Sequence, residues 1–165
     1  LNGADYLDRV RNELGLDVKV VSQADEAGLG FRTAVALQGA PAESVICWDS
    51  GGASFQITSQ DPDGGSLRSY VGTWGSGNSL ALMVEDVQGH RLAECHTPNP
   101  VSAADASALV ERLKSELAEP VAWLKGSSVT AIGGPNSMFC VASEALGSAS
   151  YTVAEVKHAL STVLG

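Results

Sequence analysis

The residues best suited to chemistry form the run 48–54 (WDSGGAS), which follows the apolar stretch 44–48. A strand buried on both faces would carry Asp49 at its end. The glycines after it allow a tight turn, and their missing Cβ atoms let backbone N–H groups approach a ligand. Asp49 could hold a divalent cation that bridges to phosphate oxygens, and Ser54 adds a hydroxyl group. The run therefore predicts a phosphate site, and an ordinary β-hairpin turn is the alternative explanation.

Two further glycine turns occur later in the chain. Gly133 and Gly134 follow the apolar residues 127–132 and precede a predicted helix, whose N-terminal amides could face an anion. A plain strand-to-helix connection is the simpler explanation. The third turn, residues 72–78, contains Trp74, which is either a stacking platform for a ligand or, more simply, a core residue. The first two turns support each other, because a polyphosphate-like ligand needs more than one anion-binding turn.

Other reactive side chains show no catalytic or metal-binding pattern. The three histidines lack the spacing of metal ligands, and neighbouring Cys95 and His96 are poorly placed for a nucleophile and its base. The chain has no GxSxG, HExxH, Walker A or Rossmann glycine pattern. Asp25 and Glu26 are an adjacent acidic pair at the start of a predicted helix. Taken alone, they are solvated acids that the helix dipole favours.

Composition limits the class of protein and its partners. A chain of 165 residues is one domain, or one domain with a fragment of a second. The net charge of −9, with ten lysines and arginines, argues against a nucleic-acid partner and against an anionic membrane surface. An anionic substrate remains possible, because backbone amides bind phosphate without net positive charge.

Three widely separated cysteines without a CxxC pair indicate a reduced, cytoplasmic protein, with Cys47 and Cys140 as small core residues. No apolar run reaches the roughly 18–20 residues that span a bilayer, and no signal segment is recognisable. The chain begins at Leu1 rather than at a methionine, so we expect that a segment is missing upstream.

The elements that must position these residues alternate between helix and strand. We expect helices over residues 4–14, 23–37, 75–87, from 102 to about 124, 136–146 and from 152, and strands over 17–21, 44–48, 54–59, 67–74 and 127–132. Ser22 with Asp25, and Thr152 with Glu155, predict capping boxes. The strands over 44–74 are joined by tight turns and predict an antiparallel meander. The class is α/β, with ligand sites at the strand ends.

The order and spacing of these motifs resemble the exopolyphosphatase/guanosine pentaphosphate phosphohydrolase (Ppx/GppA) family. Residues 2–29 are similar to the family stretch that begins NG-x-x-FL and ends SG-x-EEA-R-L. Residues 45–57 (VICWDSGGASFQI) resemble its VIDIGGGSTEL signature. Residues 132–134 resemble its later GxGGT turn, and residues 151–160 the helix that follows. The similarity covers nearly the whole chain in register.

The resemblance implies an actin-like ATPase or sugar-kinase-like (ribonuclease H-like) fold, in which two α/β lobes enclose a cleft. Residues 1–40 would be the C-terminal strip of the first lobe, as helix, strand and helix, and residues 41–165 the second lobe. The implied activity is hydrolysis of terminal phosphoanhydride bonds of inorganic polyphosphate or of guanosine pentaphosphate (pppGpp) with Mg²⁺. The family is commonly dimeric, so a homodimer is a further expectation, and the sequence does not choose between the two substrates.

The resemblance also assigns roles to single residues. Glu26 falls on the catalytic glutamate, Asp49 on the metal-associated acid, and the phosphate-binding positions are Gly51, Gly52, Ala53, Ser54, Gly133 and Gly134. The chain departs from the family pattern: Gln56 replaces an acidic residue, Gly28 an arginine, Phe55 a threonine and Ala53 a glycine, and residues 135–136 alter the later glycine turn. The phosphate loop of the first lobe would lie upstream of Leu1. The alternative is therefore a catalytically weakened relative that binds phosphate, a nucleotide or a partner protein without turnover.

Overall fold

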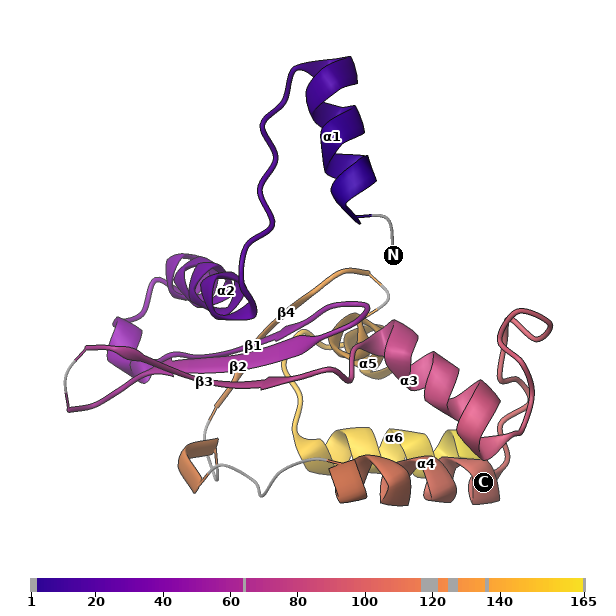
Figure 1. Ribbon diagram of the computed structural model, residues 1–165. Coiled ribbons are helices and arrows are strands. Elements are labelled where there is room, and N and C mark those ends of the chain that lie inside the picture. Colours follow the sequence, from indigo (N-terminus) through magenta and orange to yellow (C-terminus); the bar gives the residue numbers. More distant parts are fainter. Residues whose placement is uncertain (1–2, 64, 117–121, 125–127, 136, 165) are drawn as a thin grey trace.

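A four-stranded mixed sheet forms the centre of the molecule (Figure 1). The computed structural model describes residues 3–63, 65–116, 122–124, 128–135 and 137–164. The strand order is β3-β2-β1-β4, with β1 at Ile46–Ser50, β2 at Phe55–Gln60, β3 at Leu67–Gly72 and β4 at Thr130–Gly133. β1, β2 and β3 pair antiparallel, whereas β4 pairs parallel with β1. The predicted α/β class and the predicted meander are confirmed.

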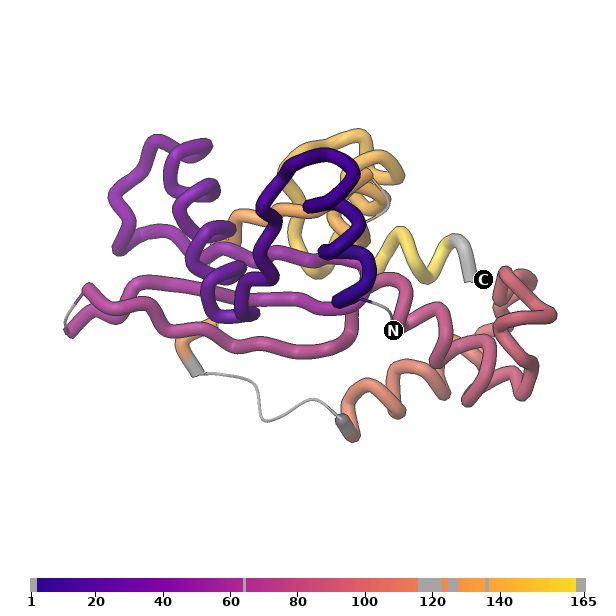
Figure 2. Tube along the Cα trace, turned by 45° about the horizontal axis from the view of Figure 1, so that its top comes forward, coloured from indigo at the N-terminus to yellow at the C-terminus, as the bar shows by residue number. Residues whose placement is uncertain are grey.

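Helices lie on both sides of this sheet. The α-helices are α1 (Gly3–Leu14), α2 (Gln23–Gln38), α3 (Ser76–Ala81), α4 (Ala103–Glu116), α5 (Met138–Leu146) and α6 (Val153–Leu164). Short turns of other helical types are η1 (Ala42–Ser44), η2 (Leu82–Val87), which continues α3 as a π-helix, and η3 (Ala122–Leu124). Figure 1 shows α2 on one side of the sheet and α4 and α6 on the other, and Figure 2 shows β1 to β3 running side by side. Among the helices of the described residues, none is long and apolar enough to span a membrane.

The core lies between α2 and the sheet. Its buried members are Phe31 and Ala34, one turn apart on α2, together with Val45 and Cys47 at the start of β1. The predicted capping box fixes the first turn of α2, since Asp25 N–H donates to Ser22 Oγ and Ser22 N–H donates to Asp25 Oδ2. The prediction that Cys140 is a core residue is wrong, because it lies on an exposed face of α5.

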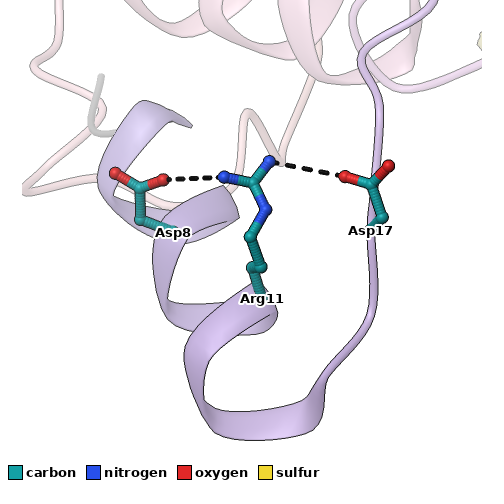
Figure 3. A network of polar contacts seen from close by, with 3 residues as sticks. All are labelled: Asp8, Arg11 and Asp17. Atoms are coloured by element: carbon teal, nitrogen blue, oxygen red, sulfur yellow. Dashed lines mark hydrogen bonds and ion pairs between the residues drawn. The ribbon is translucent and has the colours of Figure 1, made fainter.

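The segment before α2 stands apart from the sheet (Figure 1). α1 has no buried residue. Arg11 pairs with Asp8 on the same helix (3.5 Å) and with Asp17 in the chain that follows it (3.4 Å) (Figure 3). The strand predicted over residues 17–21 is wrong, because no strand of the described chain lies beside it to pair with its backbone. The division of the chain at residue 40 stays a prediction, but α2 packs directly on β1, β2 and β4.

The helix predicted to run from Ser102 to Leu124 is also corrected. α4 is described to Glu116, and η3 forms a separate short turn that contains Leu124. Two positions of the predicted apolar stripe, Leu117 and Val121, lie outside the described residues. The capping box at Thr152 and Glu155 is present at the start of α6, as predicted.

Candidate functional site

The first glycine turn is a four-residue loop, 51–54, between β1 and β2. β1 extends further than the sequence predicted, so Asp49 and Ser50 belong to the strand, opposite Gln56 and Phe55. The N–H of Gly51 donates to the carbonyl of Ser54 at 2.9 Å and closes the loop. The backbone polar groups of this loop decide what it can bind.

Three consecutive carbonyls of the loop face the first residues of α3. The hydrogen bonds are Ser76 N–H to Gly51 O (3.1 Å), Gly77 N–H to Gly52 O (2.7 Å) and Asn78 Nδ2 to Ala53 O (2.8 Å). Asn78 Nδ2 also donates to Thr73 O at 2.6 Å, so one amide joins the loop to the chain that leads into α3. The loop is therefore fixed in orientation by the helix beside it.

This orientation decides where the loop donors point. In a trans peptide unit the carbonyl and the following N–H point in opposite directions. Because the carbonyls of residues 51–53 face α3, the N–H groups of Gly52, Ala53 and Ser54 point away from it. Within the described part of the chain, these three N–H groups donate to no other residue. Three successive donors of this kind could bind an anion.

Glycine serves this loop in two different ways. A Cβ atom built on Gly75 would lie 2.5 Å from the carbonyl carbon of Gly52 and 2.6 Å from Ala53 N, so only glycine lets the chain before α3 approach the loop. A Cβ on Gly52 would meet no described atom within 4 Å, which leaves open space beside the donors. Neither Gly51 nor Gly52 has a positive φ, so the left-handed conformation is not the reason for glycine there.

Glu26 reaches the same loop from α2. The buried amide of Gln56 donates from Nε2 to Glu26 Oε2 at 3.1 Å and to Ser54 Oγ at 3.3 Å. Gln56 is 2% exposed, whereas Glu26 is exposed on the first turn of α2. The structure thus joins Glu26 and Ser54, which lie far apart in the sequence, through Gln56. From the sequence alone, Gln56 counts only as the loss of an acidic residue.

Asp49 lies on the same face of the sheet. It is the cross-strand partner of Gln56, and such partners project to the same side. A Cβ on Gly30 would lie 2.9 Å from Asp49 Oδ2, so the carboxylate packs against α2 one turn after Glu26. Burial raises the pKa of Asp49 above its ordinary value.

Cys47, two residues earlier on β1, is not a nucleophile. Burial first, and the charge of Asp49 second, raise the pKa of the Cys47 thiol to about 11. It therefore stays protonated at neutral pH and serves the core.

The second glycine turn meets the first at one edge of the sheet. Gly133 pairs with Ser50 on the parallel strand β1, directly before loop 51–54. A Cβ on Gly133 would lie 2.6 Å from the side chain of Ser137, which caps α5. Gly133 is therefore required for close packing, as in a plain connection. A Cβ on Gly134 would meet no described atom, and a phosphate contact there stays a prediction.

The site beside loop 51–54 has one carboxylate suited to the predicted Mg²⁺. No group of three or more histidine, cysteine or acidic side chains that could hold a metal ion occurs in the described ranges. Mg²⁺ is often held by one or two carboxylates together with substrate phosphates and water. Asp49 fits that role, whereas Glu26 Oε2 already accepts the Gln56 amide. The donor set suits an ion that arrives with its phosphate ligand.

Comparisons with known proteins show similarity to one phosphatase family. Residues 1–70 match the profile of the Ppx/GppA phosphatase family. One crystal structure of the Aquifex aeolicus family member is 21% identical and covers 93% of this chain with a TM-score of 0.56. The type II variant of the Aquifex aeolicus Ppx/GppA phosphatase is 23% identical and covers 88% of this chain with a TM-score of 0.50. No curated protein matches the chain significantly.

These matches confirm the predicted resemblance and the predicted fold. The described chain has the fold of the Ppx/GppA structures, which is of the actin-like ATPase type. It spans 42% and 44% of the two Aquifex aeolicus chains, which is less than half of their length.

Proposed function

Since residues 1–70 match the Ppx/GppA profile and the chain has the fold of that family, we propose that it forms part of a phosphoanhydride hydrolase site. The proposed substrates are inorganic polyphosphate and pppGpp, from which the terminal phosphate would be removed. One observation carries the proposal: the N–H groups of Gly52, Ala53 and Ser54 point away from α3 and have no partner among the described residues. Such donors suit the non-bridging oxygens of a terminal phosphate.

The surrounding residues suit phosphoryl transfer to water. This reaction is catalysed mainly by positioning and by stabilisation of charge on the equatorial oxygens. In the proposed site the amides of residues 52–54 and the hydroxyl of Ser54 hold the phosphate. Glu26, exposed at the mouth of the loop, orients a water molecule and accepts its proton. Mg²⁺, held by Asp49 and the substrate, would neutralise phosphate charge.

A second candidate is phosphate or nucleotide binding without turnover. This candidate is favoured by Gln56, which stands where the family has an acidic residue. The site therefore has only two carboxylates, those of Glu26 and Asp49, among the described residues. Under this candidate the loop binds the anion, but Glu26 drives no hydrolysis.

Phosphate release separates the two candidates. The natural protein is incubated with long-chain polyphosphate or pppGpp and Mg²⁺, beside Glu26→Gln, whose amide oxygen still accepts the Gln56 hydrogen bond. We expect turnover to fall about 10²- to 10⁴-fold in this variant, as for loss of a general base. Unchanged turnover would refute the role of Glu26. No release by the natural protein, with phosphate binding that Asp49→Ala abolishes, would establish the second candidate.

A further inference from the structure

We propose that Gln56 is a positioning residue, which ties Glu26 to the phosphate loop and takes the place of a cation beside its carboxylate. The catalytic role of Glu26 in this inference rests on the proposed function. The hydrogen bonds of Gln56 are independent of that function. One amide nitrogen joins Glu26 Oε2 on α2 to Ser54 Oγ in the loop, across 30 residues of sequence.

The position of Gln56 makes its amide rigid. It lies on β2, which pairs with β1 on one side and with β3 on the other, so its backbone is fixed by two ladders. The side chain is 2% exposed, and an amide buried so deeply is costly to leave without partners. Both of its donated bonds go to residues of the candidate site. Movement of Glu26 away from the loop would therefore leave a buried donor unsatisfied.

The chemistry of the amide sets the charge of the site. An N–H group directed at Glu26 Oε2 stabilises the carboxylate without any bound cation. A carboxylate in the place of Gln56 would face a second carboxylate across the same 3.1 Å, and such a pair requires a proton or a metal ion. The site thus holds Glu26 with a neutral donor, and Asp49 is left for a substrate-borne ion.

Metal binding without substrate tests this charge arrangement. Mn²⁺ affinity is measured by electron paramagnetic resonance for the natural protein, for Gln56→Glu and for Gln60→Glu. Gln60→Glu is a matched control, because it makes the same change on the same strand and face, at the end that pairs with Leu67. We expect Gln56→Glu to bind one Mn²⁺ at least tenfold more tightly than the natural protein. Gln60→Glu should bind Mn²⁺ with the same affinity as the natural protein. Equal affinities for all three would overturn the inference.

Nuclear magnetic resonance tests the tie itself, with no need for activity. The side-chain amide of Gln56 is followed in Glu26→Ala and in Asp25→Ala. Asp25 is the neighbouring acid, but it hydrogen-bonds Ser22 rather than Gln56. We expect both amide protons of Gln56 to shift and to exchange faster in Glu26→Ala only. The same spectrum in both variants would show that Gln56 does not hold Glu26.

Kinetics then separate positioning from folding. Gln56→Met keeps the length of the side chain and removes both donated bonds. In an active protein we expect kcat to fall about tenfold or more, with KM changed less than threefold, because the phosphate donors of the loop remain. Unchanged kcat would refute the positioning role. Absence of turnover in the natural protein would refute the proposed function, while the metal and resonance results would still decide the role of Gln56.

Discussion

Two glycine turns end adjacent parallel strands of this sheet, yet they are built differently. In loop 51–54 the carbonyls bond to α3, the N–H groups of residues 52–54 have no partner among the described residues, and the space beside Gly52 is open. In the turn after β4, Gly133 packs against Ser137, and Gly134 O accepts the Ser137 N–H at 2.9 Å. The first turn offers three donors to solvent, whereas in the second the carbonyl of Gly134 and the side chain of Ser137 start a helix.

The difference shows what an apolar strand followed by two glycines indicates. The pattern predicts a tight turn, but it does not say whether the donors of the turn are occupied. The use of the turn's polar groups depends on neighbours: α3 binds the carbonyls of the first turn, and Ser137 at the N-cap of α5 donates to Gly134 O in the second. Variants that disturb one neighbour at a time can therefore test the contrast.

Gly75→Ala should have the largest effect. Its Cβ would press on the backbone of Gly52 and Ala53, which cannot move without breaking their bonds to α3. We expect a loss of about 2–3 kcal/mol in the free energy of unfolding, typical of overpacking, measured by urea denaturation. Gly134→Ala, with open space around it, is the control and should unfold within about 0.5 kcal/mol of the natural protein. Equal stability of the two variants would mean that α3 does not clamp the loop.

Gly52→Ala should separate binding from folding. The added methyl group meets no described atom, so the fold should be kept, but it enters the open space beside the three free donors. We expect the affinity for inorganic phosphate to fall about tenfold, about 1.4 kcal/mol, measured by calorimetry. Gly134→Ala should change the affinity about twofold or less. A loss of equal size in both would show that the second turn also holds phosphate, as the sequence alone suggested.

Asn78→Ala should have a moderate effect on both properties. It removes the bonds to Ala53 O and Thr73 O, so the loop keeps only its backbone bonds to α3. We expect about 1 kcal/mol lower stability and phosphate affinity reduced about threefold. Ser137→Ala removes the cap of the second turn instead, and it should lower stability similarly while leaving affinity unchanged. Reduced affinity in Ser137→Ala would contradict the distinction between the two turns.

Asp49→Asn should have the smallest effect, visible in the pH dependence of stability. Because burial raises the pKa of Asp49, the folded chain binds its proton more readily than the unfolded chain. Stability therefore falls as the pH rises from the ordinary pKa of an aspartate through the raised value. Asparagine does not ionise, so the variant avoids the cost of burying a charge at pH 7. We expect its free energy of unfolding to be about 0.5 kcal/mol higher, after allowance for partial exposure, and its melting temperature about 1–2 °C higher. The same melting temperature difference at pH 3 and pH 7 would contradict this assignment.

Features that depend on neighbours a few residues away could be predicted from the sequence. The capping box of α2, the antiparallel meander and the existence of loop 51–54 follow from local signals, because caps and tight turns close over about four residues. The same local reasoning was wrong for residues 17–21, since an extended segment becomes a strand only beside a partner.

The assembly of the site depends on tertiary packing. Asn78 lies 25 residues from Ala53, and Gln56 lies 30 residues from Glu26, so no local pattern could pair them. The resemblance placed Glu26 and loop 51–54 in one site, but it counted Gln56 as a missing acid. The packing of α2 on β2 directs this amide toward Glu26. The packing of α3 on the loop directs three N–H groups away from α3. Hydrogen bonds depend on direction as well as distance, and direction is set only when the elements pack.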